Sequence, residues 1–214
     1  MRGERATNPI AVGDYVLLDK QEEEKTGFIT ERLERRNSMV RKSVNLSKET
    51  HVVAANLDRA FLIATVAKPS TSTGFMDRFL VTAEAYQVPV TIVFNKVDVC
   101  GEGTPEREQL EYLEGVYEKA GIPTIRTSAS TGEGLDRLTR ELAASGVNLL
   151  SGHSGVGKST LINVLLPGTD LRTGEVSDSH QKGKHTTTFA EMFPLPNGGF
   201  IIDTPGIKGF GLVH

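Results

Sequence analysis

Residues 147–160 of the chain are VNLLSGHSGVGKST. An apolar strand is predicted over 147–150 and a helix from Lys158 onward, and the residues between them fit the phosphate-binding pattern G-x-x-x-x-G-K-S/T. The glycines let successive backbone N–H groups turn toward phosphates, Lys158 reaches the terminal phosphates, and the Ser159 hydroxyl binds magnesium. We expect the Lys158 stem to face solvent until a phosphate arrives. The expected nucleotide contacts in this loop are Gly152, His153, Ser154, Gly155, Val156, Gly157, Lys158, Ser159 and Thr160.

A second motif lies earlier in the chain, where an apolar strand over 90–94 is followed by Asn95, Lys96, Val97 and Asp98. The two carboxylate oxygens of Asp98 can accept from the ring N1–H and the exocyclic amine of guanine, a pair of donors that adenine does not offer. Asn95 would bind the N7 side of the base and brace the phosphate loop, and the Lys96 stem would cover the base face. This motif is also compatible with an ordinary loop when taken alone. Together with the phosphate loop it predicts a guanine nucleotide.

Two further motifs follow predicted strands. Ser128-Ala129-Ser130 resembles the SAx loop of GTPases, in which the N–H of the second residue meets the guanine oxygen. Asp203-Thr204-Pro205-Gly206 resembles the DxxG motif, in which Asp203 would hold magnesium through water and the Gly206 N–H would sense the γ-phosphate. Both motifs extend the expected GTP site.

A long polar segment with several glycines lies between Pro167 and Thr188. We interpret it as a mobile switch loop that supplies a second magnesium ligand. Spacing alone leaves Thr186, Thr187 and Thr188 open as that ligand.

Around these motifs, apolar strands alternate with helices, which is typical of a mostly parallel sheet with helices on both faces. One helix has clear ends, with Thr104 as N-cap, Pro105 at the first helical position and Gly121 just past its end. We expect this α/β domain to span 54–214. Strands are predicted over 60–67, 90–94, 124–127 and 147–150, and a hairpin over 189–202 turns at PNGG.

The first 53 residues have a different pattern of apolar and polar residues. The stretches VGDYVLLD and GFITERL alternate apolar and polar residues without a helical period, so 1–53 is predicted to be a small all-β module. Residues 31–48 concentrate positive charge, although the whole chain has a net charge of −3. We expect salt-sensitive contacts to RNA phosphates there, the alternative being an ordinary solvated surface. The expected RNA contacts are Arg35, Arg36, Arg41 and Lys42.

Composition restricts the remaining classes of protein. A chain of 214 residues can bury a core without disulfide or metal staples. Its single cysteine, Cys100, excludes an internal disulfide and a cysteine-rich zinc site. No apolar stretch approaches the roughly 20 residues of a membrane span, and the first residues lack the apolar core of a signal peptide. We therefore expect a soluble, cytoplasmic monomer with no membrane partner.

The order of the motifs resembles the circularly permuted GTPases, with NKVD at 95–98, SAS at 128–130, GHSGVGKST at 152–160, GKHTTT at 183–188 and DTPG at 203–206. The chain is similar to the small ribosomal subunit biogenesis GTPases of the RsgA (YjeQ) family over nearly its whole length. The resemblance implies a GTP-hydrolysing switch that uses GTP/GDP and Mg²⁺ and acts on the small ribosomal subunit and its rRNA. It also implies that the N-terminal module is an RNA-binding OB-fold, and it favours Thr187 as the magnesium ligand.

The chain departs from that family at both ends. The family usually begins with further barrel strands, and about 50 residues are short for a five-stranded barrel, so we expect an incomplete OB-like barrel. The family also continues past DTPG into a zinc domain, whereas this chain stops at His214. We expect no zinc site in this chain and interpret it as a piece of a longer protein.

The residue after DTPG is Ile207, where Ras-like proteins carry the glutamine that orients the attacking water. An aliphatic side chain cannot position water, so another group must do so. By resemblance to the switch histidine of the family, His185 is the catalytic candidate. The alternative for His185 is an exposed loop histidine. His153 occupies a variable position of the phosphate loop, and we interpret its side chain as structurally incidental.

Two other functions remain open at this point. One is a non-catalytic RNA- or ribosome-binding module in which GTP only sets the conformation. The other is a P-loop ATPase or kinase, against which the NKVD motif argues.

Overall fold

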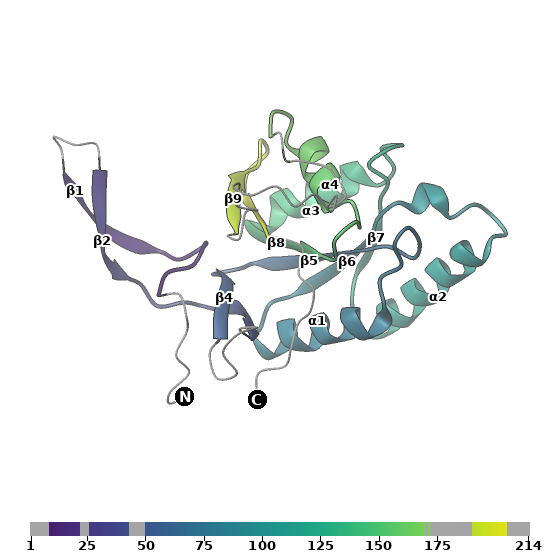
Figure 1. The fold of residues 1–214 in the computed structure, drawn as a ribbon, viewed down its shortest axis with the longest axis horizontal. Helices are drawn as coiled ribbons and strands as arrows, with labels where there is room; N and C mark the ends of the chain where they lie inside the picture. Colours follow the sequence, from purple (N-terminus) through teal and green to yellow (C-terminus); the bar gives the residue numbers. More distant parts are fainter. Residues whose placement is uncertain (1–8, 22–25, 43–49, 170, 172–189, 205–214) are drawn as a thin grey trace, which may run out of the picture.

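A computed structural model of the protein describes residues 9–21, 26–42, 50–169, 171 and 190–204, with the side chains of residues 21, 41, 42 and 50 left out. Its centre is a six-stranded sheet in the order β7-β6-β5-β8-β10-β9 (Figure 1). Neighbouring strands are parallel except for the β9–β10 hairpin. The predicted, mostly parallel sheet is therefore confirmed. The strands are β5 (Arg59–Ala64), β6 (Val90–Phe94), β7 (Thr124–Arg126), β8 (Val147–Gly152), β9 (Glu191–Pro194) and β10 (Phe200–Asp203).

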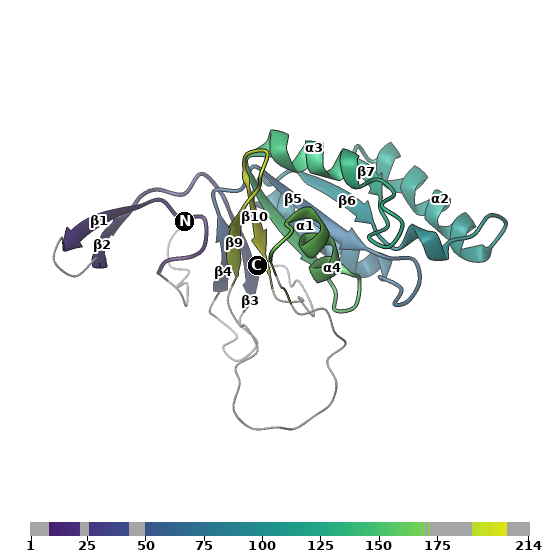
Figure 2. The ribbon, with the colours of Figure 1, turned by 90° about the horizontal axis from the view of Figure 1, so that it is seen from above.

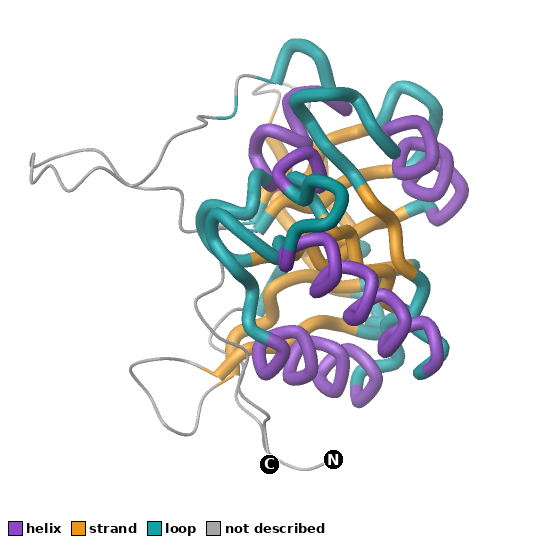
Figure 3. The backbone as a smooth tube through the Cα atoms, turned by 90° about the vertical axis from the view of Figure 1, so that its right-hand side faces the viewer, coloured by secondary structure: helices purple, strands orange, loops and turns teal. Residues whose placement is uncertain are grey.

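Helices cover both faces of this sheet (Figure 3). In β5, Leu62 packs into the core on one face, while Phe61 and Ile63 pack into the core on the other. Because both faces of the sheet are buried, β5 is apolar from Ala60 to Ala64 instead of alternating with polar residues. The first face is covered by α1 (Thr73–Ala85) and α2 (Pro105–Lys119), and the second by α3 (Leu135–Ser145) and α4 (Lys158–Leu165).

The ends of α2 follow the predicted signals. The Thr104 side chain accepts a hydrogen bond from the N–H of Arg107 at 3.3 Å, and Pro105 is the first helical residue. The helix ends at Lys119, and Gly121 adopts a φ of +80° just beyond it. Capping by a polar side chain at the start and a glycine in the left-handed region at the end explain why this helix was readable from sequence.

The strand predicted over 60–67 is shorter in the structure, because β5 ends at Ala64. There the chain turns back on itself, and Thr65 and Thr71 exchange hydrogen bonds: Thr71 N–H donates to the Thr65 carbonyl at 2.7 Å, and Thr65 N–H donates to the Thr71 hydroxyl at 3.0 Å. The backbone groups that a longer strand would pair with a neighbour are therefore used inside this turn.

The N-terminal region forms two small antiparallel sheets, as the alternating pattern predicted. The hairpin of β1 (Val16–Gln21) and β2 (Thr26–Arg32) extends away from the body of the protein (Figures 1 and 2). The second sheet pairs β3 (Ser38–Lys42) with β4 (Thr50–Ala55), so the boundary predicted after residue 53 falls inside a strand. The division into domains and the incomplete barrel stay predictions.

Within the described parts of the chain, none of the helices combines the length and the apolar character that a membrane crossing needs.

Candidate nucleotide site

The predicted motifs meet at one edge of the sheet. Strands β5, β6, β7, β8 and β10 run in the same direction, so their carboxyl ends lie side by side. Asn95 follows β6, Ser128 follows β7, His153 follows β8, and Asp203 ends β10. In open α/β sheets this carboxyl edge is where ligands bind.

The phosphate loop passes closely against its neighbours, which explains its glycines. A Cβ atom at Gly152 would lie 2.6 Å from the Ile63 carbonyl oxygen, and one at Gly157 would lie 2.6 Å from the Asn95 amide nitrogen. Gly155 and Gly157 also have φ values of +84° and +87°, in the left-handed region. The loop then enters α4 at Lys158. This cradle of backbone before a helix start fits a phosphate group.

The first two residues of the NKVD motif tie it directly to the phosphate loop. The buried Asn95 donates from Nδ2 to the Val156 carbonyl at 2.8 Å, and its Oδ1 accepts from the Thr127 hydroxyl at 3.1 Å. Lys96 donates from Nζ to the Gly155 carbonyl at 2.7 Å. Two loops about 60 residues apart in sequence are thereby joined into one unit.

Asp98 lies exposed beside the SAS loop. The Ser128 hydroxyl donates to Asp98 Oδ1 at 2.6 Å and lies 2.9 Å from the Ser130 hydroxyl. The hydrogen bond from Ser128 lowers the pKa of the Asp98 carboxyl below its ordinary value, despite the opposing effect of burial. The group is therefore an ionised acceptor at neutral pH, as a partner for two N–H donors must be. Val97 is buried and Ala129 is half-buried.

Lys158 and Asp203 form an ion pair at the start of α4 and the end of β10. The lysine is buried, so the expectation that its stem faces solvent is wrong. Thr204 helps to hold this corner, because its hydroxyl donates to the Leu150 carbonyl at 3.1 Å. Ser159 is half-buried, whereas Ser154 and Thr160 are exposed. The oxygen atoms of the aspartate and of the Ser159 hydroxyl suit Mg²⁺. The lysine at the start of a helix suits a phosphate.

Several predicted site residues lie outside the described residues. These are His185, Thr187 and Gly206, together with Ile207. In the described ranges, no group of three or more His, Cys, Asp or Glu side chains is arranged to hold a metal ion. The roles of these residues stay predictions.

Two of the arginines in the basic stretch form ion pairs with carboxylates of the same chain, Arg35 at a largely buried position and Arg36 at the surface. Arg35 binds the Asp14 carboxylate through two nitrogens at 2.6 and 2.7 Å. Burial raises the pKa of Asp14, but the hydrogen bond and charge of Arg35 outweigh it, and the pKa is lowered. Arg36 donates to Asp58 at 2.7 Å and to the Leu57 carbonyl at 3.0 Å. Both arginines therefore contribute to structure. For Arg41 and Lys42 the structure gives the backbone only.

Sequence reasoning missed two contributors to the site. The Thr127 hydroxyl holds Asn95, and the Lys68 carbonyl accepts from Lys96 Nζ at 2.7 Å. The position of Thr127 directly before the SAS loop could have identified it from the sequence. The Lys68 carbonyl could not have been identified, because any residue type supplies a backbone carbonyl.

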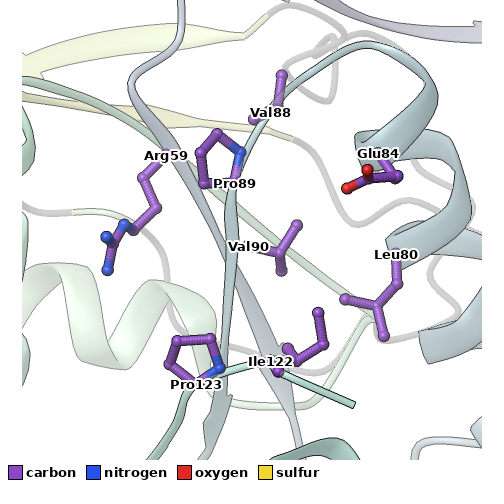
Figure 4. Close-up of a pocket in the computed structure, with 9 residues that line it drawn as sticks. Arg59, Leu80, Glu84, Val88, Pro89, Val90, Ile122 and Pro123 are labelled. Carbon is purple, nitrogen blue, oxygen red and sulfur yellow. The ribbon is translucent and has the colours of Figure 1, made fainter.

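A separate pocket of about 310 Å³ lies at the opposite, amino-terminal edge of the sheet. Figure 4 shows Val88, Pro89 and Val90 along its centre, with Glu84 and Arg59 on either side. None of the predicted site residues lines it. We therefore do not connect this pocket with the nucleotide site.

Comparison with known proteins gives consistent matches. The family model for the RsgA GTPase matches residues 32–213. The small ribosomal subunit biogenesis GTPase RsgA of Bacteroides fragilis is 54% identical over 214 residues, covering 99% of this chain and 67% of the relative. The protein of the same name from Christiangramia forsetii is 50% identical over 215 residues, covering 100% of this chain and 67% of the relative.

Solved structures resemble the chain over most of its length. YjeQ from Thermotoga maritima superposes with a TM-score of 0.71 at 34% identity, covering 92% of this chain and 61% of that one. YloQ, described as a circularly permuted GTPase, superposes with a TM-score of 0.64 at 25% identity, covering 98% of this chain and 62% of that one. The fold is therefore that of a circularly permuted GTPase, and the chain spans 67% of the first curated relatives and less than two thirds of these solved chains.

Proposed function

The chain belongs to the RsgA GTPase family, and on that premise we propose that its GTP hydrolysis serves the biogenesis of the small ribosomal subunit. The name of the relatives supports the subunit as the partner. The observation that carries the nucleotide assignment is the hydrogen bond from Asn95 to the Val156 carbonyl at 2.8 Å. It makes one unit of a guanine-recognition loop and a phosphate loop, which is what a GTP site needs.

In the proposed site, each motif has one task. Asp98 accepts the two N–H donors of guanine, the Ala129 N–H donates to the guanine oxygen, and the Lys96 stem covers the base. The phosphate loop and Lys158 hold the phosphates. Ser159, Asp203 through water, and Thr187 would hold Mg²⁺, which neutralises charge on the phosphates when bound. The Gly206 N–H would sense the γ-phosphate.

The water that attacks GTP needs a group to orient it. Ile207 has no hydrogen-bonding side chain, so we assign this task to His185. Because His185 lies in a long polar segment, an ordering partner would be required before it can act. We propose the small ribosomal subunit as that partner. This assignment makes the isolated chain a slow GTPase.

The remaining proposals concern the surroundings of the protein. We propose that the N-terminal β module contacts rRNA and that the protein acts as a monomer. We also propose a cytoplasmic location, because the protein would act on the ribosomal subunit.

Competition against a fluorescent GDP analogue tests nucleotide choice. GTP and GDP should displace the analogue and ATP should not, since adenine lacks the donors that Asp98 requires. Equal competition by ATP would overturn the guanine assignment.

Two measurements test the partner and the chemistry. Co-sedimentation with small and with large ribosomal subunits, in GDP or a non-hydrolysable GTP analogue, should show selective binding to the small subunit. Single-turnover hydrolysis should accelerate when small subunits are added. Binding without any hydrolysis would favour a non-catalytic ribosome-binding module instead.

A further inference from the structure

Residues 65–75, the segment that follows β5, pack against the phosphate loop. It begins with the tight turn closed by Thr65 and Thr71, in which the Thr65 hydroxyl also donates to the Pro69 carbonyl. It ends in the first turn of α1, where the Ser72 side chain accepts from the N–H of Phe75 at 3.3 Å. Both ends are therefore internally hydrogen-bonded, which makes the segment a firm support.

Two contacts join this turn to the middle of the phosphate loop. Lys96 Nζ donates to the carbonyls of Lys68 and Gly155, each at 2.7 Å, and so bridges the two loops. Pro69 packs close to Gly155, because a Cβ atom built there would lie 3.2 Å from Pro69 Cδ. The turn thus limits how far the loop can move outward at Gly155.

A third contact holds the beginning of the loop. The ring of His153 packs on the ring of Phe75, with centroids 3.8 Å apart and planes at 42°. Phe75 is only 1% exposed and belongs to the core between α1 and the sheet. Burial and, secondarily, the charge of Arg78 lower the pKa of His153, so the ring is neutral at neutral pH and suited to an apolar neighbour. The side chain interpreted as incidental from sequence is therefore anchored to the core.

We propose that His153 and Phe75 position the phosphate loop, and that residues 65–75 form a further positioning element of the nucleotide site. This inference rests on the proposed function, because it assigns these residues to the same GTP site. His153 directly follows Gly152, so fixing its side chain fixes the direction of the backbone N–H groups that come next. A loop already held in shape loses less conformational freedom when phosphate binds.

The inference predicts which ligand senses the change. The guanine contacts are assigned to Asp98 and the SAS loop, which follow β6 and β7, whereas His153 belongs to the phosphate loop that follows β8. His153→Ala should therefore lower the affinity for GDP by about two- to tenfold, the range expected for an aromatic pair. The affinity for GMP should stay nearly unchanged, because GMP makes fewer phosphate contacts. Phe75→Leu should do the same, and the double variant should lose no more than either alone.

The experiment is calorimetric titration of GDP and GMP into the wild type and each variant, with thermal melting of the nucleotide-free proteins alongside. His153→Phe keeps the ring contact and should retain wild-type GDP affinity. Leu110→Ala removes a buried side chain from the same core on α2, and should lower the melting temperature without changing the ratio of GDP to GMP affinity.

Three results would overturn the inference. The first is an unchanged GDP affinity in His153→Ala, and the second is an equal loss for GMP and GDP. Either would leave the proposed function standing, provided that the wild type binds GDP in preference to ATP. The third is a wild type that binds neither GDP nor GMP, which would remove the proposed function and this inference with it.

Discussion

Lys158 and Asp203 form an ion pair in the nucleotide site, although 45 residues separate them in sequence. Lys158 opens α4 after the phosphate loop and Asp203 ends β10, so the parallel pairing of β8 with β10 brings them together. Only 8% of the lysine side chain and 19% of the aspartate side chain are exposed. Removing one partner would leave the other charge buried without compensation. The lysine that we assign to phosphate binding therefore also contributes to stability.

Lys158→Ala is expected to weaken GDP and GTP binding strongly, because the cation that reaches the phosphates is lost. It should also lower the free energy of unfolding of the nucleotide-free protein by about 1–3 kcal/mol, since Asp203 loses its partner. Denaturant unfolding measures this loss. As a control, Lys158→Ala combined with Asp203→Ala should recover part of the stability. An unchanged unfolding midpoint in the single variant would show that the pair contributes nothing.

Asp98→Asn is expected to shift nucleotide preference from guanine toward xanthine, because the amide offers a donor where guanine also donates. Competition binding with GDP, XDP and ADP measures the preference. Thr131→Ala, at an exposed position of the neighbouring loop, should leave it unchanged. Retained guanine selectivity in Asp98→Asn would contradict the assigned role.

The pH dependence of GDP binding should follow the lowered pKa of Asp98. A carboxyl whose folded-state pKa is depressed stays ionised down to a pH below its ordinary value, and its contribution is lost only as the pH falls through the lowered pKa. Asp98 should therefore cause no loss of GDP affinity between about pH 8 and about pH 5. Ser128→Ala removes the hydrogen bond that lowers the pKa, so its affinity should begin to fall at a higher pH. If Ser128→Ala and the wild type show the same pH dependence of GDP affinity, Ser128 does not affect the pKa of Asp98.

Much of this site could be predicted from sequence because its motifs depend on strand ends. Once β6, β7, β8 and β10 are recognised as parallel strands, their carboxyl ends must meet, and the motifs meet with them. What could not be predicted depends on partners distant in sequence. The burial of Lys158 needs Asp203, and the engagement of Arg35 needs Asp14, 21 residues away. Neither pairing leaves a periodic or local signal, and neither does the ring contact of His153 with Phe75.

Replacing Arg35 should affect the stability of the protein, because this arginine of the basic stretch is largely buried. Arg35 is 17% exposed and its partner Asp14 is 1% exposed, so Arg35→Glu should destabilise the protein by placing two carboxylates together. Thermal melting measures this effect. A loss of ribosome binding in that variant would then report unfolding as much as lost RNA contacts.

Arg41→Glu combined with Lys42→Glu tests the RNA proposal without breaking the Arg35 pair. This variant should bind small ribosomal subunits more weakly and with a flatter dependence on salt, because fewer phosphate charges are neutralised. Co-sedimentation at several salt concentrations measures both quantities. Lys119→Glu, in the last turn of α2, is a single charge reversal outside the basic stretch and should leave binding unchanged. If the salt dependence of Arg41→Glu/Lys42→Glu equals that of the wild type, the patch does not contact RNA.

His185→Ala is expected to remove most of the GTP hydrolysis that small ribosomal subunits stimulate, while changing GTP affinity little. A group that orients the attacking water acts mainly in the transition state, so its loss lowers the rate constant and spares binding. Single-turnover hydrolysis with and without subunits, in the longest natural form of the protein, measures the effect. His180→Ala alters another histidine of the same polar segment and should keep the stimulated rate. A His185→Ala variant that is stimulated as well as the wild type would reduce His185 to a loop residue and remove the catalytic assignment.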